Sequence, residues 1–270
     1  MARNPVLWLE LRIRSSEKRL WILALFGMLV MAAVTGLVMA SFFAEQIYRR
    51  ADLSNVGTGL VWACLGCHAA LMILLAPLAG AGRISSEREQ RTLPALLNSS
   101  LTPLQILWGK LVGCWLFVIW LGVTALPFLA VGAMWGGPPL AMVAAGFAFN
   151  TFAGLTLATL ALGLSGWFGR SLTSYLTTGA VLIGWLVVFP MLGGLLTVLD
   201  HWLNWKQTGL VSYISYYHLP FTPLIVLGTA DWDLHRADVL QQLGFALAAW
   251  TGLSVVGIIL AHRGLKREVY

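Results

Sequence analysis

Residues 111–169 read LVGCWLFVIWLGVTALPFLAVGAMWGGPPLAMVAAGFAFNTFAGLTLATLALGLSGWFG, and none of them is Asp, Glu, Lys or Arg. A helix needs about 20 apolar residues to cross the hydrocarbon core of a bilayer, so this run is long enough to cross it twice. Its midpoint, WGGPP at 135–139, is unable to continue a helix and predicts a tight hairpin. The run therefore predicts two antiparallel membrane-spanning helices.

The composition of the whole chain agrees with a membrane protein. Of its 270 residues 59% are hydrophobic and 10% are charged, and the mean hydropathy is +0.80, whereas a soluble domain carries about 25% charged residues. Lipid cannot satisfy open backbone groups, so the spanning elements should all be helices. We expect an all-α integral membrane protein with six transmembrane helices in a single transmembrane domain, 1–270. The uncharged runs predict spans at about 20–43, 57–80, 109–134, 140–167, 172–199 and 239–261.

The positions of Lys and Arg predict the orientation. Most of the basic residues fall on one side of the six predicted spans, in the N-terminal segment, in 83–110, at Arg170 and in the last residues of the chain. Cytoplasmic loops carry an excess of Lys and Arg. We therefore expect a multi-pass protein of the cytoplasmic (inner) cell membrane with both termini in the cytoplasm. The net charge of +6 then reflects loops that face lipid headgroups, and we expect no nucleic-acid partner.

Two segments outside the spans have a composition typical of the membrane interface. Residues 4–19 mix apolar and basic side chains and predict an N-terminal interfacial helix, with an unstructured basic tail as the alternative. Asp200–Asp238 is rich in Trp and Tyr, whose polar-edged rings favour the headgroup layer. We expect external re-entrant or interfacial helices there, between spans five and six. The alternative is a surface loop with an ordinary aromatic belt.

The run Cys64-Leu65-Gly66-Cys67-His68 fits C-x-x-C-H, the attachment pattern of c-type haem. It lies inside the second predicted span, where an exposed attachment site is not expected and where small residues suit helix packing. His68 is an ionisable group at membrane depth and is therefore a possible intramembrane functional residue. The alternative is a neutral imidazole bonded to a neighbouring helix. A membrane redox or haem protein that uses Cys64, Cys67 and His68 stays an alternative function.

The sequence lacks the motifs of a nucleotide-binding protein, a hydrolase or a proton-coupled transporter. It has no G-x-x-x-x-G-K-[ST], no H-E-x-x-H and no G-x-S-x-G, and its predicted spans contain no Asp or Glu. Proton-coupled carriers usually need buried carboxylates. We therefore expect no enzyme activity, no nucleotide site and no cofactor in this chain, and an energy source in another one.

Arg83–Lys110, RISSEREQRTLPALLNSSLTPLQILWGK, is the internal segment richest in charge. Its SERE run at 86–89 fits the S-x-x-E capping box and predicts a helix from Glu87, which Pro94 should break or kink. Thr102-Pro103-Leu104-Gln105 predicts a second start, for a helix that runs through Lys110 into span three. A short helix that carries charges and leucines is more typical of a docking element than of a solvated loop that faces lipid headgroups.

This segment resembles the cytoplasmic loop of ABC-type-2 transporter permeases, which reads approximately E-R-E-x-G-T-L-E-x-L-L and continues with Pro-Leu and Gly-Lys. The matching residues here are Glu87-Arg88-Glu89, Thr92-Leu93, Leu96-Leu97, Pro103-Leu104 and Gly109-Lys110. The N-terminal Asn4-Pro5-Val6 and Glu10-Leu11-Arg12 are similar to the family's N-P-V-x-x-x-E-L-R. Two departures change the expected local helix geometry: Arg91 stands where the family usually has Gly, and Pro94 stands where Glu is common.

The resemblance implies the membrane subunit of an ATP-driven exporter. Two permease copies, identical or paralogous, would pair, and separate ABC ATP-binding subunits would bind ATP and Mg²⁺. The cytoplasmic coupling helix at 84–97, between spans two and three, would dock on the ATPase. The implied docking residues are Glu87, Arg88, Glu89, Arg91, Thr92, Leu93, Leu96 and Leu97. A third reading is a non-transporting membrane anchor for a cytoplasmic partner. The cargo and the direction of transport are not predicted by any motif.

Overall fold

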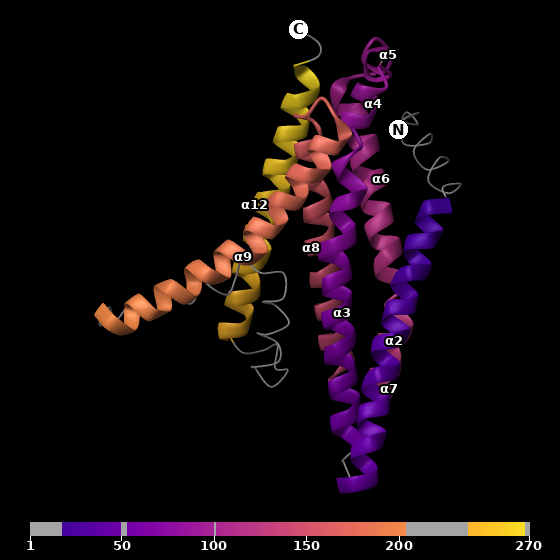
Figure 1. Cartoon of the computed structure of the whole chain (residues 1–270), viewed down its shortest axis with the longest axis vertical. Coiled ribbons are helices and arrows are strands. Elements are labelled where there is room, and N and C mark those ends of the chain that lie inside the picture. Colours follow the sequence, from indigo (N-terminus) through magenta and orange to yellow (C-terminus); the bar gives the residue numbers. More distant parts are fainter. Residues whose placement is uncertain (1–17, 50–52, 100, 204–236, 268–270) are drawn as a thin grey trace.

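The computed structural model describes residues 18–49, 53–99, 101–203 and 237–267, and every regular element in these ranges is a helix (Figure 1). Six of the helical stretches are long and apolar enough to cross a membrane, namely α2, α3, α6 with α7, α8, α9 and α12. This confirms that the described part of the chain is all-helical with six candidate spans, and it indicates a multi-pass membrane protein. The helices are α2 (Lys18–Arg49), α3 (Leu53–Ala81), α4 (Ser85–Glu89), α5 (Leu93–Leu97), α6 (Pro103–Val123), α7 (Leu126–Met134), α8 (Leu140–Ser165), α9 (Ser171–Leu203) and α12 (Ala237–Lys266).

The predicted hairpin at 135–139 separates α7 from α8. Gly136 has a φ of 79°, a left-handed conformation that glycine adopts without steric cost. The third predicted span is less regular than expected, because α6 ends at Val123 and α7 begins at Leu126. Pro127 explains the interruption, since its ring clashes with the carbonyl four residues earlier and it has no N–H to donate.

The centre of the bundle is formed by α3 and α8, and α12 packs against α8 on one side. Close approach of these helices depends on glycine. A Cβ on Gly80 of α3 would collide with the carbonyl of Ala158 in α8, and a Cβ on Gly163 would lie 2.5 Å from the carbonyl oxygen of Gly257 in α12. Small residues allow such backbone contacts between helices in lipid.

The outer helices α2 and α9 expose most of their apolar surface, as at Leu37 and Ile183. Figure 1 shows α9 leaning away from the bundle along its second half. Exposed leucine and isoleucine faces are what a helix presents to lipid or to another membrane-embedded chain. Nearly all of the interfacial helix predicted for 4–19 lies outside the described residues, and so do nearly all of the external elements predicted for 200–238.

The charged segment lies at one end of this bundle. Helices α4 and α5 occupy the same end as the last turn of α12, and α7 lies toward the opposite end (Figure 1). The hairpin end is anchored by Gly57, whose backbone lies against the carbonyl of Trp135. The α4–α5 segment therefore meets the ends of several candidate spans at once.

Candidate functional site: the α4–α5 segment

Helix α4 does not begin as the sequence predicted. The S-x-x-E run does not form a capping box, and the helix starts at Ser85, two residues before the predicted start at Glu87. Because the chain continues from α3 in a nearly helical path, the Ser86 amide donates to the Gly82 carbonyl at 2.9 Å. Ser86 therefore lies inside a hydrogen-bonded helical turn and not at the N-terminus of a helix, where unpaired amides would need a cap.

The open amides at the start of α4 are instead satisfied by a residue from another helix. The hydroxyl oxygen of Ser165, the last residue of α8, accepts from the amides of Ile84 and Ser85, each at 3.0 Å. The Ser85 and Ser165 hydroxyl oxygens are also 3.1 Å apart. All three residues are buried from water. The Ser165 hydroxyl therefore replaces water as the hydrogen-bond acceptor of these amides.

Glu87 connects α4 to α6. One oxygen of its carboxylate lies 2.5 Å from the ammonium of Lys110, whose side chain is only 1% exposed. The same ammonium donates to the Arg83 carbonyl at 3.4 Å. An ammonium in such a buried position requires a counter-charge, because an unpaired buried charge is strongly destabilising.

Arg88 connects α4 to two further helices. Its guanidinium donates to the carbonyls of Phe168 at 2.7 Å and Gly166 at 3.1 Å, just after α8. It also donates at 3.4 Å to the carbonyl of Gly264, in the last turn of α12. Carbonyls at a helix C-terminus lack intrahelical donors and carry partial negative charge. One cation therefore satisfies the ends of both α8 and α12.

Glu89 connects α4 to the start of α9. Its carboxylate accepts from the Ser171 amide at 3.1 Å and from the Ser171 hydroxyl at 2.6 Å. These hydrogen bonds lower the pKa of Glu89 below the ordinary value of a glutamate, the side-chain bond having the larger effect. A carboxylate at this position also complements the positive end of the helix dipole of α9.

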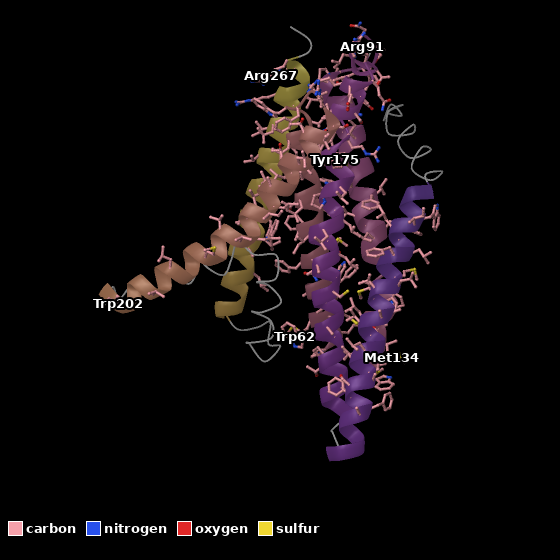
Figure 2. All side chains as sticks on the ribbon, viewed as in Figure 1. Trp62, Arg91, Met134, Tyr175, Trp202 and Arg267 are labelled. Carbon is pink, nitrogen blue, oxygen red and sulfur yellow. The ribbon has the colours of Figure 1, made fainter. Side chains whose placement is uncertain are left out.

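The turn from α4 to α5 projects away from the bundle. Arg91 has a φ of 57° and is exposed, and Figure 2 shows it at the tip of this end of the molecule. The Thr92 amide and hydroxyl donate to the Glu87 carbonyl at 2.9 and 3.2 Å, which closes the turn. A left-handed φ costs a residue with a Cβ about 1–2 kcal/mol.

The leucines of this segment divide into two groups. Leu93 is fully buried in the main apolar core of the chain, whereas Leu96 and Leu97 are half-buried. Fewer residues are therefore available to contact another protein than the eight docking residues that the resemblance implies. The exposed residues of the turn and of α5 are Gln90, Arg91, Thr92, Pro94, Ala95 and Asn98.

The re-entry into α6 follows the sequence prediction. The Thr102 hydroxyl accepts from the Gln105 amide at 3.3 Å, and the Gln105 side chain accepts from the Thr102 amide at 2.9 Å, which completes a capping box. The in-chain partners of Glu87, Arg88 and Glu89 were not predicted. Their contacts bring together residues up to 176 positions apart in the chain, and no spacing motif reports such a contact.

His68 lies in the centre of the bundle, fully buried, with its ring stacked on Phe147 at 5.0 Å between centroids. Neither imidazole nitrogen has a hydrogen-bond partner among the described residues, so the predicted bond to a neighbouring helix is not observed. Cys64 lies close to a hydroxyl, with 3.5 Å between its sulfur and Thr35 Oγ1. Within the described ranges no group of three or more His, Cys, Asp or Glu side chains is placed to hold a metal ion.

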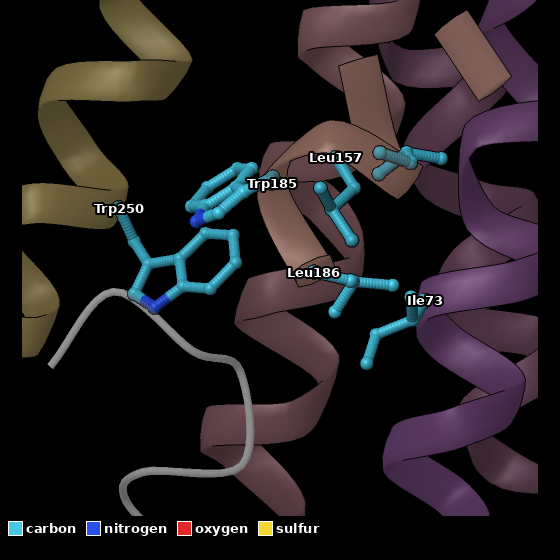
Figure 3. A pocket seen from close by; sticks show the side chains of 6 residues that line it. Ile73, Leu157, Trp185, Leu186 and Trp250 are labelled. Carbon is cyan, nitrogen blue, oxygen red and sulfur yellow. The ribbon is translucent and has the colours of Figure 1, made fainter. Parts of the chain in front are cut away.

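A small crevice lies between α3, α8, α9 and α12 (Figure 3). The rings of Trp185 and Trp250 form one side of it, with centroids 5.2 Å apart. The other lining side chains are aliphatic, so the crevice offers an apolar surface without acid–base or nucleophilic groups. They are Ile73, Leu157, Leu182 and Leu186.

No protein-family model matches this chain, and no curated protein matches it significantly. The candidate site is therefore defined by the residues of the α4–α5 segment and by their contacts. These contacts describe a short element that is exposed at its tip and bonded at its base to the ends of α6, α8, α9 and α12.

Proposed function

We propose that this chain is the permease subunit of an ATP-driven ABC transporter, an exporter in the cytoplasmic membrane whose α4–α5 end faces the cytoplasm. In this proposal a separate ATP-binding subunit binds ATP and Mg²⁺, docks on the α4–α5 segment, and acts on a pair of permease copies. The observation that carries the proposal is the set of bonds from three successive residues of α4. Glu87, Arg88 and Glu89 join this short helix to four of the candidate spans.

These bonds suit the transmission of force. Glu87 holds α6, Arg88 holds the ends of α8 and α12, and Glu89 holds the start of α9. A displacement of α4 by a docked ATPase would therefore act on four helix ends together. Rigid-body shifts of packed helices are a usual way for one site to change the conformation of another. A solvated loop that faces lipid headgroups would have no need of these contacts with four spans.

The backbone at Arg91 gives further support to the resemblance. The family pattern has Gly at this position, and the chain here adopts a φ of 57°, in the left-handed region that glycine favours. The preference of the family and the conformation of this turn are independent observations, and they agree.

The structure changes the roles that we propose for individual residues. Arg91 and Thr92 are exposed and contact the ATPase, together with Ala95, while Leu96 and Leu97 form the half-buried edge of the same surface. Leu93 anchors the segment to the core. Glu87, Arg88 and Glu89 hold α4 to the spans and transmit its movement, and His68 has no part in docking.

The proposal is tested by gentle purification of the tagged chain from native membranes, followed by identification of the proteins that accompany it. We expect an ATP-binding subunit. Ala95→Glu places a charge on the exposed face of α5 and should abolish this co-purification. The matched control is Ala141→Glu, an exposed position in the first turn of α8 at the opposite end, and it should have no effect.

Two outcomes would count against the proposal. Absence of any ATP-binding protein from the native complex would remove it. An ATP-binding subunit that hydrolyses ATP in a reconstituted complex at the same rate with every candidate cargo would favour the membrane-anchor alternative. For the redox alternative, the described surroundings of His68, Cys64 and Cys67 provide no supporting observation, and a purified protein without haem absorbance or bound metal would remove it.

A further inference from the structure

The last turn of α12 carries three cations on one face. Arg263, Lys266 and Arg267 are exposed and occupy positions i, i+3 and i+4, which are neighbours on a helix surface. Like charges at these spacings repel each other. An anion bound at this face would relieve the repulsion between these cations.

The cationic face is held in a fixed position beside an interfacial aromatic residue. Gly264 packs against the backbone of Gly166, so the last turn of α12 lies directly on the turn between α8 and α9. The guanidinium carbon of Arg267 lies 3.8 Å above the centre of the Trp167 ring. Trp167 is partly exposed just beyond the end of α8, a position typical of tryptophan at the level of lipid headgroups.

No carboxylate of the described chain neutralises this face. Among the described residues, Arg263, Lys266 and Arg267 form no ion pair with Asp or Glu. Glu89 is the acidic group near the α8–α9 turn, and its carboxylate is bonded to Ser171 and lies beside Arg170. Arg170 adds another exposed cation to the same turn. The surface is thus strongly cationic at the end of two candidate spans.

We propose that this cationic face, formed by Arg263, Lys266, Arg267 and Trp167, binds the phosphate headgroup of an anionic phospholipid. Guanidinium groups donate paired hydrogen bonds to phosphate oxygens, and the indole ring contacts the glycerol and upper acyl region. The exposed apolar residues of α12, such as Val256 and Ile259, provide a lipid-facing surface below the headgroup. The inference depends on the membrane-spanning assignment and not on the proposed ATPase partner.

The position of the face also separates it from the proposed docking surface. Figure 2 shows Arg267 and Arg91 on different sides of the same end. A cytoplasmic protein on α4–α5 would therefore leave α12 accessible to the bilayer. Membrane lipid is the anion that reaches this face laterally.

The test uses the full chain, purified in neutral detergent and depleted of lipid, with dioctanoyl phosphatidylglycerol and dioctanoyl phosphatidylcholine as probes. Bound lipid is counted by native mass spectrometry over a titration. We expect phosphatidylglycerol to bind preferentially, and the triple variant R263Q/K266Q/R267Q to bind it about tenfold more weakly. The control R263K/R267K keeps the charges and should keep the preference. A second control, R49Q, removes a cation from the last residue of α2 and should bind as the unchanged protein does.

Each other outcome overturns the proposal. Equal binding of the two lipids, or full binding of phosphatidylglycerol by the triple variant, would show that the face is not a lipid site. Loss of a co-purifying cytoplasmic protein from the triple variant, with its phosphatidylglycerol binding unchanged, would assign the face to a protein partner. If the triple variant does not fold, the single variants R263Q and K266Q should each weaken binding of phosphatidylglycerol, and unchanged binding in both contradicts the inference.

Discussion

The carboxylate of Glu87 lies 2.5 Å from the ammonium of Lys110, and this lysine is almost fully enclosed by the chain. The pair joins the short helix α4 to the first turns of the third candidate span. Buried charges are retained only when they are paired, and removal of one partner leaves the other without compensation. The pair is therefore a specific point at which α4 and α6 depend on each other.

Glu87→Gln should destabilise the protein, because Lys110 keeps its charge and loses its counter-charge. We expect a loss of about 1–3 kcal/mol, since Glu87 itself is partly open to solvent. Thermal unfolding in detergent measures the effect. The double variant Glu87→Gln/Lys110→Met removes the buried charge as well and should recover most of the stability. A double variant as unstable as the single one would contradict the pairing.

Arg88→Lys should weaken the attachment of α4 to α8 and α12 although it keeps the charge. The planar guanidinium reaches carbonyls on two helices at once, and an ammonium on a flexible chain does not reproduce that fork. We expect a loss of about 1–2 kcal/mol in unfolding experiments. Arg91→Lys is the matched control, because Arg91 is exposed, and it should change stability little. Equal effects of the two variants would show that Arg88 has no special role.

Ser165→Ala should destabilise the start of α4, because two buried amides lose their acceptor. The expected cost is about 1–3 kcal/mol. Ser86→Ala should be nearly neutral, because the Ser86 hydroxyl does not cap the helix. The two variants thus distinguish the cap that the sequence predicts from the cap that the structure contains. Unfolding midpoints in the reverse order would mean that Ser86 caps α4 after all.

The comparison of these two serines shows what the sequence alone predicts. The spans were predictable because the thickness of a bilayer fixes the length of an uncharged run, and the hairpin at 135–139 because Gly and Pro act locally. The Thr102–Gln105 capping box was also predictable, since its partners are three residues apart. Ser165 and Ile84 are 81 positions apart. Their contact exists only because α3 and α8 pack closely through glycines such as Gly80.

The candidate site shows the same division. The sequence indicated that 83–110 was unusual and that its charged residues were important, and the structure places those residues close together. The sequence could not indicate the partners of Glu87, Arg88 and Glu89, because these partners are distant in the chain and are brought near only by the fold. The burial of Leu93 is likewise a consequence of tertiary packing, which a run of leucines does not reveal.

The last prediction concerns the turn at Arg91, where the backbone is left-handed. Arg91→Gly should leave stability unchanged or slightly higher, because the relief of about 1 kcal/mol of backbone strain offsets the greater freedom of glycine in the unfolded chain. Arg91→Val should lower stability by about 1–2 kcal/mol, since a β-branched residue disfavours this conformation most. Thermal unfolding in detergent compares the stability of the unchanged protein with that of the two variants. Co-purification of the proposed ATP-binding subunit then tests the role of the side chain in docking. If Arg91→Gly keeps the proposed partner, the shape of the turn mediates docking, and if it loses the partner at full stability, the guanidinium does.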